Sequence, residues 1–275
     1  MSRAGIVLCG GRSSRMGRTK AWLPWFGRSM VEHVVDRLRP LVSEIVVVKS
    51  ADLVLPDLPA RIVSDRKPGL GPLAGIREGL AAIESDWAFV TSVDAPHLSA
   101  EYVNALFAAG RTIAPVAEGH VQVLSAIYPR QAGERAEALL ADGIRRPRAL
   151  LEALACARFE FEPLASHGPR PWTGFNTPRE YLEAVRSVEP DASAEIEFLG
   201  RSAALRRGGG SPWRVPVGTL GEILGKQPEA SSLLAAGRVR KPYLVSVAGR
   251  DLVRDLSVPV GPDERVSVID AMVGG

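Results

Sequence analysis

The stretch AGIVLCGGRSSRMGRTK, residues 4–20, joins a short apolar run to a loop rich in glycine and basic residues. The apolar run at 4–9 predicts a buried strand. Gly10 and Gly11 let the backbone turn sharply and bring its N–H groups close to an anion, because no Cβ atom stands in the way. Four cations follow within the loop: Arg12, Arg15, Arg18 and Lys20. We therefore expect a phosphate-binding loop directly after the first strand.

Two common phosphate loops do not fit this stretch. The dinucleotide fingerprint G-x-G-x-x-G is not supplied by Gly10, Gly11 and Arg12. The P-loop needs four residues between its glycines and a lysine after the second glycine. Here five residues separate Gly11 from Gly17, and Arg18 follows. The loop therefore indicates another class of phosphate-binding α/β protein.

Strand-like and helix-like segments alternate after the loop. The expected strands lie at 44–50, 60–65 and 87–93, and the expected helices at 30–41, 73–85 and 99–110. A β-hairpin over 111–129 and further helices near 131–141, 147–156 and 177–188 complete this region. Such alternation is typical of an α/β fold in which helices cover both faces of a mostly parallel sheet.

The loop resembles the signature L-x-G-G-x-S-x-R-M-G-x-x-K of nucleotidyltransferases that activate small phosphorylated molecules. The matching residues are Leu8, Gly10, Gly11, Ser13, Arg15, Met16, Gly17 and Lys20. The Gly-Gly pair and the following AWLPWFGRSMVEHVVDRL, residues 21–38, look most like the molybdenum cofactor guanylyltransferases, the MobA family. The resemblance covers roughly residues 3–188 and implies a Rossmann-like nucleotidyltransferase domain.

Three further segments agree with that family in order and spacing: VSDRKPGLGPLAGI (63–76), TSVDAPHL (91–98) and FNTPREY (175–181). The resemblance implies that the nucleotide is bound by Leu8, Cys9, Gly10, Gly11, Lys20, Asp65, Gly71 and Asp94. It implies catalytic roles for Arg15, Lys20 and Asp94, with Asp94 as the Mg²⁺ ligand. Asn176 would bind the substrate near its pterin end.

The implied reaction transfers GMP from GTP to the phosphate of molybdopterin, the precursor of molybdenum cofactor, and releases pyrophosphate. Two polyanions must approach each other, so charge neutralisation and in-line positioning are the protein's main tasks. The sequence departs from the family at Cys9, where alanine is usual, and at Thr19, where aspartate is common. CTP or a sugar phosphate therefore stays open as the alternative substrate of the same reaction type.

The composition changes at EPDASA, residues 189–194, which predicts a nucleotidyltransferase domain at 1–190 and a second domain at 191–275. Strands are expected at 195–200, 213–218, 242–249 and 265–272, and helical spacing occurs at 219–227 and 230–237. This mixture predicts a small α+β domain. It resembles the ubiquitin-like (β-grasp) sulfur carriers, the MoaD/ThiS family. The shared residues are Pro216, Gly218, Thr219, Glu222, Ile223 and Leu224, with the terminal Gly274 and Gly275.

The terminal Gly-Gly implies a reactive end. A carboxylate that must be adenylated and converted to a thiocarboxylate has to enter a narrow channel, and residues without Cβ atoms make the thinnest chain. The resemblance implies Gly275 as that carboxylate. Its partners would be an adenylating, E1-like enzyme and the large subunit of molybdopterin synthase. A thiamin-type carrier and a plain interaction module remain the alternatives.

Composition excludes several other classes. The net charge of +3 is too small for a general polyanion binder, and the basic run RRPR at 145–148 lacks interleaved aromatic residues, so we expect no nucleic acid partner. Two cysteines, Cys9 and Cys156, fit a reducing compartment. No apolar run approaches the roughly 20 residues of a membrane span, and strand-like sequence begins at once. We therefore expect a cytoplasmic protein without a signal peptide.

Overall fold

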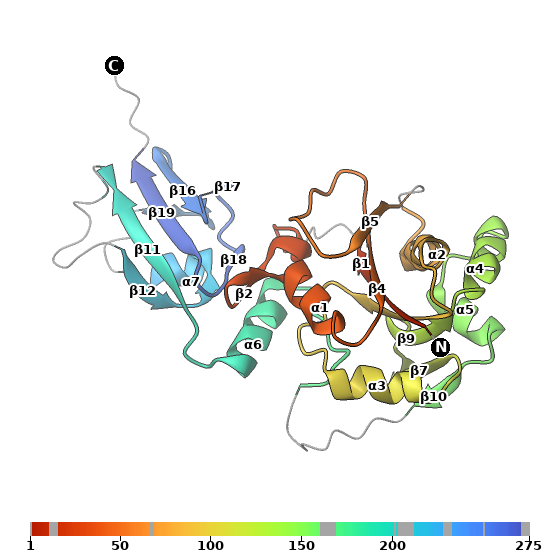
Figure 1. Cartoon of the computed structure of the whole chain (residues 1–275). Helices are drawn as coiled ribbons and strands as arrows, with labels where there is room; N and C mark the ends of the chain where they lie inside the picture. Colours follow the sequence, from red (N-terminus) through yellow and green to blue (C-terminus); the bar gives the residue numbers. More distant parts are fainter. Residues whose placement is uncertain are drawn as a thin grey trace. The chain divides into compact units, whose positions relative to one another are not determined.

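The computed structural model describes residues 2–10, 16–65, 69–159, 169–200, 202, 212–227, 233–249 and 251–270. The chain divides into two compact units (Figure 1). The first contains Met1–Arg12 and Met30–Gly174, and the second contains Ser13–Ser29 and Phe175–Gly275. Residues 13–29 and 175–190 thus fall in the second unit, whereas the domain ranges 1–190 and 191–275 stay a prediction about how the sequence is organised.

An eight-stranded sheet forms the centre of the first unit. Its order is β10-β7-β9-β6-β1-β4-β5, with β8 paired to β7. The strands are β1 (Arg3–Cys9), β4 (Glu44–Lys49), β5 (Arg61–Ser64), β6 (Trp87–Ser92), β7 (Ile113–Ala117), β8 (His120–Val121), β9 (Ser125–Pro129) and β10 (Ala157–Phe159). β1 is parallel to β4 and β6, β4 to β5, and β7 to β10, while β9 is antiparallel to β6 and β7. The predicted mostly parallel sheet is confirmed.

Alternate residues of β1 face different helices, because side chains alternate across a strand. On one face, a Cβ added to Gly5 would lie 3.1 Å from Leu38 of α1 (Met30–Leu38). On the other face, a Cβ added to Gly79 of α2 (Pro72–Ala82) would lie 2.5 Å from Ile6. α1 and α2 therefore cover opposite faces, and α2 lies so close to β1 that only glycine fits at the contact.

The remaining helices of this unit divide between the same two faces. Phe89, which pairs in register with Gly5, contacts Tyr102 of α3 (Ala100–Ala108), so α3 shares the face of α1. α4 (Ala132–Ala141) and α5 (Pro147–Ala153) bury Ala136, Leu139, Leu150 and Leu151 in the core cluster that also holds Ile6 and α2. Helices on both faces, as the sequence predicts, are therefore present.

The predicted hairpin at 111–129 is present in its first half. β7 and β8 pair around Glu118 and Gly119, which have φ values of 51° and 76°. Two consecutive positive φ angles suit a two-residue hairpin turn. The third segment, β9, lies between β7 and β6 in the sheet, so it pairs mainly with a strand that precedes the hairpin in sequence.

The strand order reverses direction at β1. The chain leaves β1 through α1 to β4 and β5 on one side, and then returns through α2 to β6 on the other side. Ligands of open α/β sheets bind outside the carboxyl ends of the strands at such a reversal. The carboxyl ends of β1 and β6 are therefore the place to look for a site.

A five-stranded sheet dominates the second unit, in the order β12-β11-β19-β16-β17. Its strands are β11 (Ser193–Leu199), β12 (Trp213–Pro216), β16 (Tyr243–Val247), β17 (Asp251–Val253) and β19 (Arg265–Asp270). The first and last strands, β11 and β19, are parallel neighbours, and the other pairs are antiparallel. α7 (Leu220–Gly225) buries Leu220, Ile223 and Leu224 in the core beside this sheet. Thr219 and Glu222 close a capping box at its start.

The helical spacing at 230–237 does not produce a helix in the described residues 233–237. Leu234–Ala235 (β14) instead pairs with Arg238–Val239 (β15). Ala236 and Gly237 between them have φ values of 48° and 72°. A turn of this kind produces a hairpin. These residues therefore form two short strands, although their apolar spacing is compatible with a helix.

Short elements complete the second unit. α6 (Pro178–Val188) starts at Thr177, whose side chain accepts a hydrogen bond from the Glu180 amide, as expected for the helix at 177–188. The others are η1 (Lys20–Trp22), the pair β2 (Pro24–Trp25) and β3 (Arg28–Ser29), and the pair β13 (Gly218–Thr219) and β18 (Pro259–Val260). Among the described residues, no helix combines the length and the apolar character that crossing a membrane requires.

Candidate functional site

The reversal point of the first unit brings together the ends of β1 and β6. Leu8 is paired in register with Ser92, and the amide of Val93 donates to the Leu8 carbonyl at 3.1 Å. Asp94 follows directly and is half-buried. Leu8, Cys9 and Gly10 therefore lie beside Asp94, although 84 residues separate Gly10 from Asp94 in the sequence.

The Asp94 carboxylate is held from two sides. The hydroxyl of Ser92 donates a hydrogen bond to Asp94 Oδ1. Gly174 lies against the same residue, since a Cβ added there would be 3.0 Å from Oδ1 and 3.2 Å from the carbonyl oxygen. Neither neighbour was predicted from the sequence. Ser92 could have been found from its spacing of two residues before Asp94, whereas nothing in the sequence indicates that Gly174 contacts it.

Cys9 lines this site as a small apolar residue and does not act as a nucleophile. Its side chain is buried, and burial, together with the nearby Asp94 charge, raises the pKa of the thiol far above its usual value. The thiol therefore stays protonated at neutral pH and behaves as a small apolar group. Cysteine in place of the usual alanine is compatible with the site for this reason.

Asp94 is a carboxylate of the kind that binds magnesium ions. Mg²⁺ is usually held by one or two carboxylates, with water and substrate phosphates completing its shell. The described residues contain no group of three or more His, Cys, Asp or Glu side chains placed to hold a metal. A single anchored carboxylate at the reversal point is therefore suited to a metal that arrives with a nucleotide, and not to an all-protein metal centre.

Gly71 and Asp65, the other described residues of this unit that are predicted to bind the nucleotide, lie at different places. Gly71 precedes α2 with a φ of 80°, one turn before Gly75, and a Cβ added to Gly75 would lie 3.3 Å from Leu8. Asp65 follows β5, and its amide donates to the Lys49 carbonyl at 2.7 Å. In the sheet, β5 is two strands from β1. Gly71 is thus one helical turn from the residue that contacts Leu8, and Asp65 lies further along the same edge of the sheet.

Lys20 and Asn176 come together in the second unit. Lys20 Nζ donates to Asn176 Oδ1 at 2.9 Å and lies 5.7 Å from the centre of the Phe175 ring. Asn176 is fixed in turn, because its backbone N–H donates a hydrogen bond to Glu180 Oε2 at 2.6 Å. The structure thereby joins the end of the glycine-rich loop to the start of the segment FNTPREY, residues 175–181. The predicted residues Gly11, Arg15 and Gly275 lie outside the described residues.

Arg18 has a different partner from the phosphate expected for a loop cation. Its guanidinium donates to both carboxylate oxygens of Glu264, at 2.7 and 2.8 Å, and to the Pro259 carbonyl at 3.3 Å. The Arg18 and Glu264 side chains are only 11% and 6% exposed. The positive charge of Arg18 is therefore neutralised within the protein.

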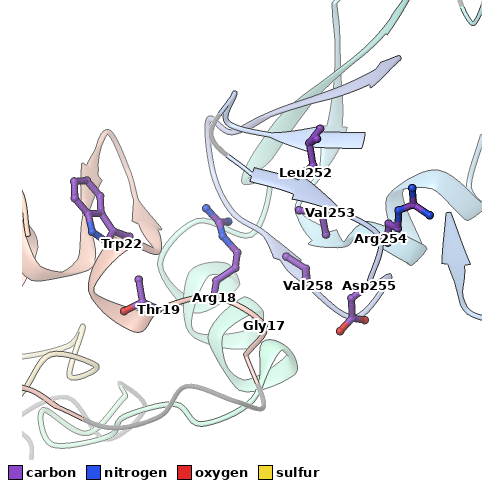
Figure 2. A pocket seen from close by; sticks show the side chains of 9 residues that line it. All are labelled: Gly17, Arg18, Thr19, Trp22, Leu252, Val253, Arg254, Asp255 and Val258. Atoms are coloured by element: carbon purple, nitrogen blue, oxygen red, sulfur yellow. The ribbon is translucent and has the colours of Figure 1, made fainter. Parts of the chain in front are cut away.

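Two hollows accompany these residues. The larger, of about 800 Å³, belongs to the second unit, where Gly17, Arg18, Thr19 and Trp22 form one side and residues from Leu252 to Val258 form the other (Figure 2). The smaller, of about 400 Å³, belongs to the first unit. It is lined by Ala117, Glu118, His120, Gln122, Arg170, Trp172, Thr173 and Gly174. Because Gly174 also touches Asp94, the smaller hollow adjoins the reversal point.

The chain is similar in sequence to a known family of transferases. Residues 5–158 match the family described as the MobA-like NTP transferase domain. The chain is 32% identical over 195 residues to a probable molybdenum cofactor guanylyltransferase of Bacillus mycoides, covering 67% of this chain and 96% of that protein. A similarly named protein of Bacillus cereus strain G9842 is 32% identical over 205 residues, covering 68% and 98%.

Solved structures share the fold of the same region. Molybdopterin-guanine dinucleotide biosynthesis protein A of Archaeoglobus fulgidus superposes with a TM-score of 0.54 and 24% identity, over 66% of this chain and 96% of that one. The 2-C-methyl-D-erythritol 4-phosphate cytidylyltransferase of Thermus thermophilus gives a TM-score of 0.53 and 20% identity, over 67% and 97%. At these identities the superpositions establish the fold.

Proposed function

Because this chain belongs, through residues 5–158, to the family of MobA-like NTP transferases, we propose that its N-terminal part is a molybdenum cofactor guanylyltransferase. That the chain is a nucleotidyltransferase follows from the family match and the shared fold. The finer assignment rests on the relatives' printed names. The observation in the structure that supports it best is Asp94, held by Ser92 and Gly174 at the reversal point of the sheet.

The proposed reaction is a displacement at phosphorus. An oxygen of the molybdopterin phosphate forms a bond to the α-phosphorus of GTP, and the bond from that phosphorus to the bridging oxygen breaks, so that pyrophosphate leaves. When bound, Mg²⁺ would neutralise charge on the phosphate oxygens, and Asp94 would hold it. The ammonium group of Lys20, oriented by Asn176, would bind a phosphate oxygen. No covalent protein intermediate is needed, in agreement with the protonated thiol of Cys9.

We propose that the pterin acceptor occupies the smaller hollow. Trp172 offers an aromatic face for a fused ring, and Arg170 and His120 offer polar groups at the lining. The hollow adjoins Asp94 through Gly174. An acceptor bound there would approach the reversal point from the side of β7 and β8.

A product assay tests this proposal. The protein is incubated with Mg²⁺, molybdopterin and either GTP or CTP, and the dinucleotide product is identified by mass. We expect product from GTP, and Asp94→Asn should lower the rate by at least about 100-fold with an unchanged circular dichroism spectrum. If product formed only with CTP, the protein would transfer a cytidylyl group and not a guanylyl group. Full activity of Asp94→Asn would mean that another residue holds the metal.

A second function is proposed for the C-terminal domain, that of a ubiquitin-like sulfur carrier. The observation that favours it is the sheet order β12-β11-β19-β16-β17, with the first and last strands as parallel neighbours and one helix packed beside the sheet. This is the arrangement expected for a β-grasp fold. In it the last strand, β19, runs through the middle of the sheet and leads directly into residues 271–275.

Intact mass measurement tests the carrier function. The full chain is incubated with ATP, a sulfur donor and an E1-like adenylating enzyme. Replacement of one oxygen by sulfur, mapped to Gly275, would support the proposal. An unchanged mass, with the same adenylating enzyme active on another carrier, would leave the domain as an interaction module.

A further inference from the structure

The end of the glycine-rich loop, from Gly17 onward, packs against residues of the C-terminal domain within the second unit. Gly17 has a φ of 64°, and a Cβ added to it would lie 2.9 Å from Val258. Arg18 is bound by Glu264 and by the Pro259 carbonyl. Pro24 accepts a hydrogen bond from Tyr181 at 2.5 Å. These contacts occur on both sides of Lys20 in the sequence.

Glu264 is the centre of this packing. Its Oε2 accepts from Arg18 and also from the Gly261 amide at 2.9 Å. A bidentate guanidinium–carboxylate pair restricts both side chains in distance and in plane. Because both partners are nearly buried, solvent does not compete for the pair, and the loss of one partner would leave an unpaired buried charge. Tyr181 belongs to the same cluster, since its hydroxyl is the atom nearest to a Cβ added at Gly261. Burial, and after it the nearby Glu264 charge, raises the pKa of its phenol.

We propose that Glu264, a residue of the C-terminal domain, is a positioning residue for nucleotide binding: by holding Arg18, it fixes the loop that carries Lys20. This inference rests on the proposed nucleotidyl transfer. Arg18 itself does not bind the nucleotide, because its guanidinium is occupied by Glu264 and Pro259. The C-terminal domain accordingly holds the end of the nucleotide-binding loop in place, in addition to any role as a carrier.

A double-mutant cycle tests the proposal in the full chain. Glu264→Gln keeps the size of the side chain and removes its charge, and Arg18→Gln removes the other partner. Each single variant should raise the KM for GTP by about tenfold, with a smaller change in kcat. The double variant should be no worse than either single one, because both changes break the same interaction. Hydrogen exchange of the amides of residues 16–25 should accelerate in all three proteins.

The matched control is Glu195→Gln. Glu195 pairs with Arg265 at 2.8 Å in the same domain, but that pair is exposed, at 32% and 51%. Its loss should leave both the KM for GTP and the exchange of residues 16–25 unchanged. Should Glu264→Gln unfold the second unit, Arg18→Lys carries the test, because it keeps the charge and loses the bidentate geometry. An intermediate KM is then expected.

Two results would overturn the proposal. If Arg18→Gln raises the KM while Glu264→Gln leaves it unchanged or lowers it, Arg18 binds the nucleotide and Glu264 only offsets its charge. If the exchange of residues 16–25 is unchanged in both single variants, Glu264 does not fix the loop. A wild-type chain that transfers no nucleotide would refute the proposed function instead, and the exchange measurement would still decide whether Glu264 fixes the loop.

Discussion

Gly174→Ala should damage the candidate site through a single methyl group. The three atoms nearest to the added Cβ all belong to Asp94: Oδ1 at 3.0 Å, Cγ at 3.1 Å and the carbonyl oxygen at 3.2 Å. Ordinary contacts start at 3.4 Å, so Asp94 must retreat by about 0.4 Å. Because side chain and backbone are pressed together, a rotation of the carboxylate alone does not relieve the contact.

The expected losses follow from that displacement. A misplacement of 1 Å costs about 100-fold in rate, so a shift of about 0.4 Å should lower kcat by roughly five- to tenfold. Overpacking by one methyl group should lower the free energy of unfolding by only about 1 kcal/mol. The change in activity should therefore exceed what a small loss of stability explains, and the Mg²⁺ concentration for half-maximal rate should rise.

The assay is pyrophosphate release with GTP and molybdopterin at varied Mg²⁺, alongside a thermal unfolding curve. Gly133→Ala is the control, because it lies in the same unit and an added Cβ meets its nearest atom at 3.4 Å. It should retain wild-type kinetics. If Gly174→Ala matched Gly133→Ala in kcat and in Mg²⁺ dependence, the position of the Asp94 carboxylate would not matter for the reaction, and the site would have to be sought elsewhere.

Three further predictions concern other parts of the chain. Asn176→Ala removes the acceptor of Lys20 Nζ and should lower kcat/KM about tenfold, whereas an unchanged value would show that Lys20 needs no such partner. Burial, with the charges of His33 and Arg37, lowers the pKa of His97 to about 4. The unfolded chain therefore binds a proton before the folded one as pH falls from about 6.5 to about 4, and stability declines in that window. His97→Gln should flatten this decline in denaturant curves, and an equally steep decline would contradict the shift. Thr219→Ala opens the capping box of α7 and should cost about 1 kcal/mol in urea unfolding, while no loss would show that the cap is unimportant.

Much of the fold could be predicted from local pattern. The apolar runs of β1, β4 and β6 and the periodicity of α1, α2 and α3 indicate an α/β fold, since a strand buried on both faces needs an apolar residue at nearly every position. The pattern failed at Leu234–Val239. There the apolar spacing is compatible with a helix, and two positive φ angles at Ala236 and Gly237 make a hairpin instead.

A glycine-rich loop and an aspartate after a buried strand are local signals, and the resemblance of the surrounding motifs to the MobA family is what gave the candidate residues their predicted roles. Leu8, Gly10, Lys20, Asp94 and Asn176 all belong to short motifs. Their partners were not visible there. Gly174 is 80 residues from Asp94 in the sequence and carries no functional group. Its role is to leave space for the Asp94 carboxylate and backbone, which a Cβ atom would contact.

The sequence by itself therefore determined the succession of strands and helices along the chain and the residues that bear chemical groups, because these depend on neighbours a few positions apart. Only the tertiary structure decided which groups meet. Glu264 reads as an ordinary surface carboxylate between polar neighbours, and Arg18 as one of four loop cations. Their ion pair spans 246 residues, and no local pattern records a contact that arises only when the loop packs against the turn before the last strand.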